Sequence, residues 1–191
     1  MHQKNYSLIF RIMHWLMAFC LLFILLTIFL RLNWLNRGNI EGIIQNHLTV
    51  TNQSLPESDI TAIARQIRKP MWDWHIYIGY VLVGLFSLRI LLAFLNKMKF
   101  ESPFVKSLSG KEKFQYAIYL IFFICLAASL VTGLFIEFGP ETLKDFMEET
   151  HKLSIYYLIA FILLHIGGVL LAEFTNKKGI ISNVISGTEK Q

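Results

Sequence analysis

The sequence has few charged residues and very little cysteine. Charged side chains make up 16% of its 191 residues, whereas a typical soluble domain carries about 25%. This shortage excludes an ordinary water-soluble domain, and the hydrophobic fraction of 54% indicates a membrane protein. The two cysteines, Cys20 and Cys125, lie inside apolar runs, which argues against a disulfide framework.

The sequence also lacks internal repeats and low-complexity tracts, and contains four long apolar runs instead. These runs cover approximately residues 12–32, 72–95, 114–138 and 151–174. Each is long enough to cross a bilayer as a helix, which takes about 20 residues. We therefore predict an all-α membrane protein: a bundle of four transmembrane helices that forms a single domain over residues 1–191.

The first two spans are joined by a long polar connection, residues 33–71. Within it, the segment from Pro56 to Arg68 is expected to be helical, because isoleucine and alanine recur there at helical spacing and Ser58 is a suitable N-cap. Such a short extramembrane helix either lies on the membrane surface or packs as a helical loop on the bundle. The sequence leaves both arrangements open.

Lysine and arginine are enriched in the cytoplasmic connections of membrane proteins, so their distribution predicts orientation. Five occupy the second connection: Lys97, Lys99, Lys106, Lys111 and Lys113. The flanks of the spans contain Lys4, Arg11, Lys177, Lys178 and Lys190. The third connection has only Lys144, and the long first connection opposes the trend with Arg37, Arg65, Arg68 and Lys69. We predict that both termini are cytoplasmic, and we assign the net charge of +5 to orientation rather than to a nucleic-acid partner.

The fourth span has a histidine at each end, His151 and His165, which are 14 residues apart. At about 100° per residue, this spacing puts both rings on the same face of a helix. At about 1.5 Å per residue, the two rings are about 21 Å apart along the helix axis. Since the apolar core of a bilayer is about 30 Å thick, each histidine lies in its own half of the membrane.

Two further histidines, His14 and His75, lie near the starts of the first and second spans. With both termini cytoplasmic, His14 and His165 share the cytoplasmic half and are called the inner pair. His75 and His151 share the opposite half and are called the outer pair. Ionisable residues inside spans are rare and usually functional.

Two imidazoles from different helices, one on each side of a flat ring, are suitable axial ligands for a haem iron. Closed six-coordination of this kind favours electron transfer over catalysis at the iron. The sequence has no C-x-x-C-H motif for covalent attachment. We therefore predict two non-covalent b haems, one held by His14 and His165 and the other by His75 and His151.

Small residues near these histidines would let a haem approach the backbone. Three glycines are candidates for this cofactor-binding role: Gly79, Gly133 and Gly168. Glycines also serve in close packing between transmembrane helices, and the sequence does not separate the two roles. Arg11 and Arg89 share helix faces with His14 and His75 respectively, and either guanidinium could pair with a haem propionate. The alternative is an arginine that extends to the cytoplasmic interface.

Three stretches of the chain carry a resemblance to a known family. They are RIMHW at Arg11–Trp15, WHIYIGY at Trp74–Tyr80 and HKLSIYYLIAFILLH at His151–His165. With these motifs the whole chain resembles the bacterial cytochrome b561 and nickel–iron hydrogenase b-type cytochrome family. The resemblance implies a four-helix bundle in the cell inner membrane that binds two b haems through the same histidine pairs. It also implies a place in a respiratory chain and electron exchange with membrane quinone.

Three functions are compatible with this sequence. The favoured one is a dihaem cytochrome that transfers electrons across the bilayer between quinone and a soluble donor or redox subunit at the outer face, either as an electron carrier or as a quinone-linked oxidoreductase. The second is the membrane anchor of a hydrogenase- or dehydrogenase-type complex, although no extra span of the hydrogenase type is present. The third is a metal or proton transporter that uses the four histidines as a relay, but the inverted repeats and broken helices of transporters are missing.

Overall fold

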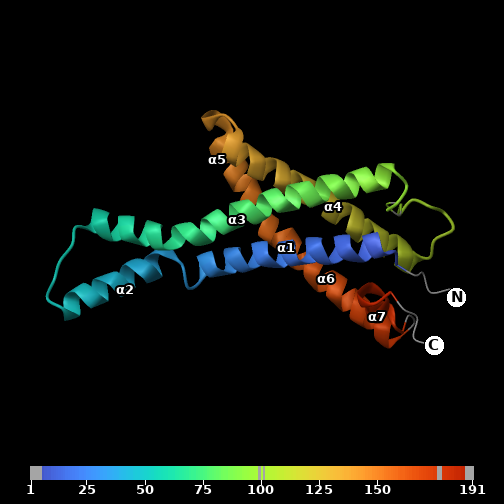
Figure 1. Cartoon of the computed structure of the whole chain (residues 1–191), viewed down its shortest axis with the longest axis horizontal. Coiled ribbons are helices and arrows are strands. Elements are labelled where there is room, and N and C mark those ends of the chain that lie inside the picture. Colours follow the sequence, from blue (N-terminus) through green and yellow to red (C-terminus); the bar gives the residue numbers. More distant parts are fainter. Residues whose placement is uncertain (1–5, 99, 101, 176–177, 188–191) are drawn as a thin grey trace. The chain divides into compact units, whose positions relative to one another are not determined.

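The computed structural model describes residues 6–98, 100, 102–175 and 178–187, which form helices and connections without a strand. The helices of these ranges, labelled in Figure 1, are α1 (Leu8–Leu32), α2 (Arg37–Val50), α3 (Glu57–Phe94), α4 (Gly110–Phe138), α5 (Glu141–Lys152), α6 (Ser154–Phe174) and α7 (Ile180–Ile185). Four lysines of the orientation argument, Lys4, Lys99, Lys177 and Lys190, lie outside the described residues.

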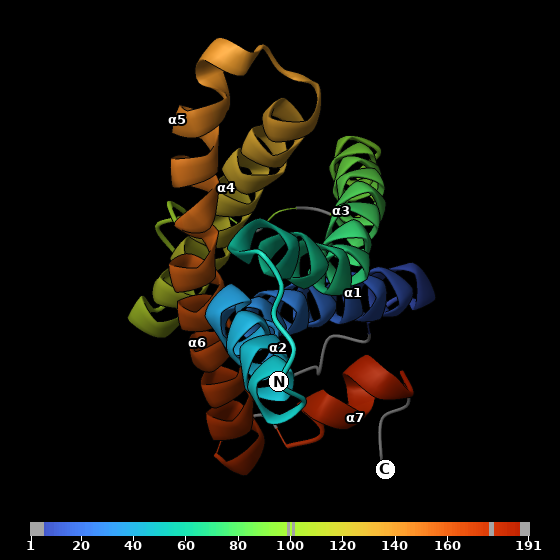
Figure 2. The ribbon, with the colours of Figure 1, turned by 90° about the vertical axis from the view of Figure 1, so that its left-hand side faces the viewer.

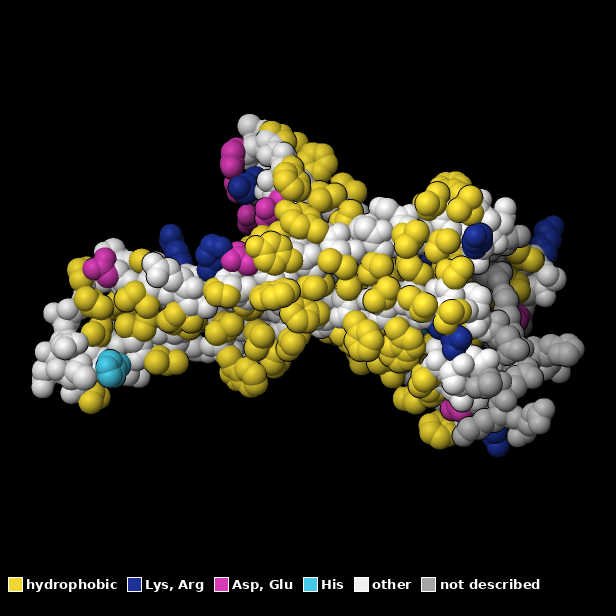
Figure 3. Space-filling model, viewed as in Figure 1, with side chains coloured by type: hydrophobic (Ala, Val, Ile, Leu, Met, Phe, Trp, Pro, Cys, Tyr) yellow, Lys and Arg dark blue, Asp and Glu magenta, His cyan; other side chains and the backbone are white. Residues whose placement is uncertain are grey.

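Four helical segments are long and apolar enough to cross a membrane, which confirms the prediction of an all-α membrane protein with four spans. They are α1, α3, α4 and the continuous segment Glu141–Phe174 made of α5 and α6. Large apolar side chains cover the surfaces of these helices (Figure 3), and Phe138 and Phe174 are 75% and 78% exposed. A surface of this kind is stable against lipid and would be unfavourable in water.

The chain divides into two units, which are described separately. The first contains residues 1–16 and 85–191, and the second contains residues 17–84. In the first unit, α4 packs against α5 and α6, and α7 packs against α6 (Figures 1 and 2). The ring of Phe122 in α4 stacks on that of Phe161 in α6, with centroids 3.6 Å apart. The second unit contains most of α1, the whole of α2 and the longer part of α3.

The α3–α4 connection is bounded by two local signals in the sequence. Asn96 adopts a positive φ of 58°, and the N–H of Lys97 bonds the Leu92 carbonyl at 2.9 Å, which closes the end of α3 in a Schellman motif. At the start of α4, Ser109 and Glu112 form a capping box. The capping box starts α4 at Gly110, four residues before the predicted start of the third span at residue 114.

The segment from Pro56 to Arg68 is helical, as predicted, but it does not form a separate helix. It is the beginning of α3, which continues through Pro70 into the second span. Proline has no N–H and removes one hydrogen bond from a helix. An ion pair between Lys69 and Asp73, 2.6 Å apart, connects the two sides of Pro70 and helps the helix to continue.

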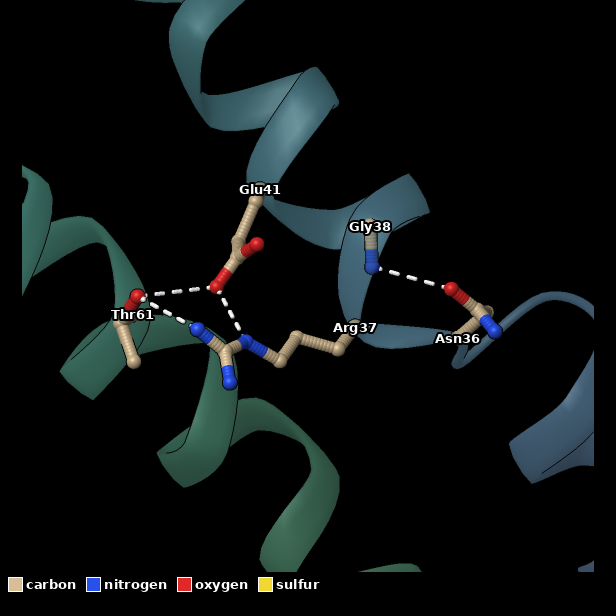
Figure 4. A network of polar contacts seen from close by, with 5 residues as sticks. All are labelled: Asn36, Arg37, Gly38, Glu41 and Thr61. Carbon is tan, nitrogen blue, oxygen red and sulfur yellow. Dashed lines mark hydrogen bonds and ion pairs between the residues drawn. The ribbon is translucent and has the colours of Figure 1, made fainter.

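The short extramembrane helix of the first connection is α2, which the apolar pattern did not single out. The Asn36 side chain caps its start by accepting the N–H of Gly38. Figure 4 shows how α2 is joined to α3: Arg37 bonds Glu41 at 2.6 Å, and the Thr61 hydroxyl bonds Glu41 at 2.9 Å. These contacts hold the pKa of Glu41 below its ordinary value, chiefly through the Arg37 bond. The Glu41 carboxylate is therefore charged at neutral pH and pairs with the Arg37 cation.

Two segments outside the predicted spans are helical. The acidic stretch after Pro140 is the amphipathic helix α5, so His151 lies in the last turn of α5 and only Leu153 separates α5 from α6. The segment after the fourth span contains α7. The Glu173 carboxylate accepts the N–H groups of Gly179 and Ile181 at the start of α7, at 2.8 and 3.1 Å. These bonds cap the start of α7 and stabilise this short helix.

Candidate functional site

The structure brings His14 of α1 and His165 of α6, the predicted inner pair, close together within the first unit. Their ring centroids are 6.0 Å apart and their planes differ by 50°. Aromatic side chains surround both rings: Phe161 stacks on His165 at 5.4 Å, and Phe10 stacks on His14 at 6.2 Å. The Tyr119 hydroxyl lies 3.4 Å from Nδ1 of His165. The two imidazoles therefore lie close together among aromatic side chains.

The separation of this pair can be compared with what a haem iron requires. With iron–nitrogen bonds of about 2 Å, two imidazoles on opposite sides of one iron have ring centroids roughly 6 Å apart. The observed 6.0 Å meets that requirement. Over the described part of the chain, no three His, Cys, Asp or Glu side chains gather into a group that could hold a bare metal ion. A haem supplies four nitrogen ligands of its own and needs only two from the protein, so the donor set fits a haem.

His151, in the last turn of α5, contacts α4 within the first unit. Its Nδ1 is 3.0 Å from the Ser129 carbonyl and 3.1 Å from the Thr132 hydroxyl. Gly133 lies beneath the ring, since a Cβ added at this glycine would be only 3.2 Å from Cε1 of His151. Gly133 was predicted to let a flat ring approach the backbone, and the ring that approaches it here is the imidazole of His151.

A network of hydroxyl groups fixes the part of α4 that contacts His151. The Ser129 and Ser154 hydroxyls are 2.6 Å apart, and the Tyr157 hydroxyl donates to Ser129 at 3.0 Å. These groups line a cavity of about 150 Å³ between α4 and the α5–α6 segment, together with Cys125 and Thr132. Hydrogen bonds between helices inside a membrane join the helices and also satisfy their polar groups. The network thus sets the position of the Ser129 carbonyl that His151 contacts.

His75 belongs to the second unit, where α1 and α3 supply its surroundings. Its Nδ1 is 2.8 Å from the Thr27 hydroxyl of α1. The Trp72 ring stacks on the imidazole at 4.9 Å with an interplanar angle of 3°, and the Arg31 guanidinium lies 4.3 Å from the Trp72 ring on α3. A cation over an aromatic ring is attracted by the ring's negative face. These contacts fix the ring plane of His75 one helical turn beyond Trp72.

Arg89 is buried, with only 7% of its surface exposed, although it is charged at neutral pH. Its guanidinium donates to the Met98 carbonyl at 2.6 Å and lies 4.1 Å from the Phe100 ring and 5.7 Å from the Phe123 ring. Arg89 therefore holds the connection after α3 against α4. A guanidinium has five N–H donors, so this role leaves donors for a propionate.

Arg11 contacts α7. Its guanidinium donates to the Ile185 carbonyl at 3.2 Å, and the Trp15 indole donates to the Val184 carbonyl at 3.3 Å. Gly187 has a φ of 71°, and a Cβ at this position would collide with the Arg11 guanidinium at 2.6 Å. Cationic and N–H donors at the end of a helix satisfy its last carbonyls. The structure thus gives Arg11 a contact with the C-terminal end of α7.

The other two predicted glycines have open surroundings. A Cβ added at Gly79 or Gly168 would meet no heavy atom of the structure within 4 Å. Their cofactor-binding role stays a prediction. Sequence reasoning missed Thr27, Ser129 and Thr132, whose polar atoms contact the histidines. The only signal for the two threonines is a hydroxyl inside an otherwise apolar span, and a carbonyl contact such as that of Ser129 leaves no signal in the sequence.

Together the fold and the site define a multi-pass, all-helical membrane protein with histidines placed along its spans. A family model for prokaryotic cytochrome b561 matches residues 5–187, and the chain belongs to this family. It is therefore a membrane b-type cytochrome that takes part in electron transfer, which confirms the resemblance carried by the sequence motifs. Searches of curated proteins and of solved structures found no match to the chain.

Proposed function

We propose that this cytochrome holds two b haems and transfers electrons across the bilayer to or from membrane quinone. His14 and His165 would ligate the inner haem, and His75 and His151 the outer haem. The observation that carries the proposal is the 6.0 Å separation of the His14 and His165 rings, which suits two axial ligands of one iron. When bound, each haem supplies a reversible one-electron couple.

The residues of this chain would hold and orient each haem and shield it from water. The aromatic rings of Phe10 and Phe161 exclude water from the inner pair and restrict the imidazole planes. Polar contacts at Nδ1 orient His75 and His151. Two histidines on each haem would leave no coordination position for oxygen, so the haems would supply electron transfer only.

The cellular setting follows from the same proposal. The chain would lie in the cell inner membrane with both termini in the cytoplasm, and the outer haem would exchange electrons with a soluble donor or a partner subunit. A stand-alone cytochrome and the membrane anchor of a larger complex use the same four ligands. Both versions predict the same haem content.

The deciding measurement is a dithionite-reduced minus oxidised absorption spectrum of the purified protein, with a pyridine haemochrome assay. We expect a sharp low-spin b-type α band and two haems per chain, because each imidazole pair closes the coordination of one iron. One haem per chain would show that one pair is not a site. A featureless visible spectrum after expression with adequate haem would reject the dihaem proposal and favour the histidine-relay transporter.

A second measurement tests the buried arginine. Arg89→Leu removes a charge-assisted hydrogen bond to Met98 and the contact with the Phe100 ring, so we expect a loss of about 1.5–3 kcal/mol of stability. Thermal release of haem in detergent would report this loss. If Arg89 also pairs with a propionate of the inner haem, the midpoint potential of that haem should shift more than that of the outer haem. Equal shifts in both haems would restrict Arg89 to its packing role.

A further inference from the structure

The same contact recurs at two of the four histidines. In the second unit the Thr27 hydroxyl of α1 is 2.8 Å from Nδ1 of His75. In the first unit the Thr132 hydroxyl of α4 is 3.1 Å from Nδ1 of His151. Each threonine lies on a different helix from its histidine, and both histidines belong to the predicted outer pair. The same arrangement, a threonine hydroxyl beside Nδ1 of a histidine on another helix, therefore occurs in both units.

The direction of each hydrogen bond follows from what else the hydroxyl touches. The Thr27 hydroxyl is 2.6 Å from the Ile24 carbonyl of its own helix. A carbonyl oxygen can only accept a hydrogen bond, so the Thr27 hydroxyl uses its single proton to donate to the Ile24 carbonyl. Toward His75 the Thr27 oxygen can then only accept a hydrogen bond. The proton between Thr27 and His75 must then come from the imidazole, which donates from Nδ1.

Thr132 repeats this reasoning with a second constraint. Its hydroxyl lies 3.0 Å from the carbonyls of both Ala128 and Ser129. The hydroxyl donates its hydrogen bond to one of these two oxygens. Nδ1 of His151 also lies 3.0 Å from the Ser129 carbonyl, which can only accept. Both neighbours of this nitrogen therefore require that Nδ1 carries the proton.

An imidazole protonated at Nδ1 has its lone pair on Nε2, and this lone pair is the one a metal binds. We propose that Thr27 and Thr132 are positioning residues, which fix the tautomer and ring orientation of His75 and His151 so that Nε2 of each ring serves as an axial ligand of the outer haem. This inference rests on the proposed dihaem function. It adds that the two hydroxyls raise the basicity of the ligands and so stabilise the oxidised iron.

A merely structural role would not need these contacts. A threonine inside a membrane helix satisfies its hydroxyl through a carbonyl one turn earlier, and both threonines do so. Valine has nearly the same shape and would fill the same space between the helices. Valine cannot accept a hydrogen bond from the N–H at Nδ1, so comparing threonine with valine separates the positioning role from the packing role.

The experiment compares Thr132→Val with Thr132→Ser, and Thr27→Val with Thr27→Ser, in the full-length protein purified with haem. Loss of a hydrogen bond to the second ring nitrogen of a ligating histidine usually weakens metal binding about 10- to 100-fold. We expect each valine variant to retain the outer haem about tenfold more weakly and to raise its midpoint potential. The ferric electron paramagnetic resonance signal of the outer haem should also change, because it depends on the imidazole planes. The serine variants and the inner haem should match the wild type.

Several outcomes would overturn the inference. Valine variants that match the serine variants in haem retention, potential and resonance signal would show that the hydroxyls do not act on the ligands. Equal changes at both haems would indicate general packing. A valine variant that fails to fold is replaced by the pair at the other threonine, which lies in the other unit. A wild-type protein without haem would reject the proposed function itself, whereas a dihaem wild type with unaffected valine variants rejects only this inference.

Discussion

Replacing His165 with alanine should remove the inner haem and leave the outer haem in place. The ring centroids of His165 and His14 are 6.0 Å apart, and one imidazole cannot hold a haem in six-coordinate, low-spin form. The outer ligands depend on other contacts, those of Thr27, Ser129 and Thr132. We expect the haem content to fall from two to one per chain, and the remaining haem to keep its potential and its low-spin spectrum.

His14→Ala is the matched variant, because it removes the other proposed ligand of the same iron from a different helix. It should give the same single-haem spectrum as His165→Ala. Phe161→Leu keeps both imidazoles and removes only the ring stacked on His165, so it should keep two haems. Loss of both haems in His165→Ala would contradict independent sites, and loss of none would remove His165 from the ligand set.

Enlarging Gly133 should affect the outer haem alone. A Cβ at this position would be 3.2 Å from Cε1 of the His151 ring, closer than most real contacts of a Cβ. Gly133→Ala should therefore move the ring by a few tenths of an ångström and weaken the outer site. Gly133→Val adds two more carbons against the ring, so we expect loss of the outer haem, measured as one haem per chain by the pyridine haemochrome assay.

Gly84→Val is a suitable control for the added bulk. Gly84 also lies inside a membrane helix, but a Cβ there meets no heavy atom of the structure within 4 Å. This variant should keep both haems. A Gly133→Val protein with two haems and an unchanged outer potential would show that the His151 ring does not need its present position.

Much of the fold could be predicted from the sequence because membrane helices leave a strong signal. Four apolar runs predicted the four spans. The spacing from His151 to His165 predicted one helix with both rings on the same face, but His151 lies in the last turn of α5 and His165 lies in α6. The ends of the helices were predicted less accurately. The capping box of Ser109 and Glu112 starts α4 at Gly110, before the predicted start of the third span at residue 114. The predicted helix Pro56–Arg68 is not separate from the second span, because α3 continues through Pro70.

The candidate site was predictable only in part, for a physical reason. A histidine inside an apolar run is conspicuous because its burial is costly, and the His14–His165 proximity agrees with the predicted inner pair. The partners of a histidine are different. Thr27 and Thr132 are 48 and 19 residues from the rings they contact, so only the three-dimensional fold reveals them. The arginines show the same limit, since Arg11 contacts Ile185 and Arg89 contacts Met98.

The contact between α1 and α7 has a consequence for the assembly of the inner site. Arg11 and Trp15 flank His14 on α1, and their bonds to Ile185 and Val184 tie that helix to the segment that follows α6, which carries His165. This contact closes a loop of chain, and the two proposed ligands His14 and His165 lie near the ends of that loop. Part of the entropy of bringing the two residues together is then lost when the chain folds. Under the dihaem proposal, the contact between α1 and α7 therefore lowers the entropic cost of binding the inner haem.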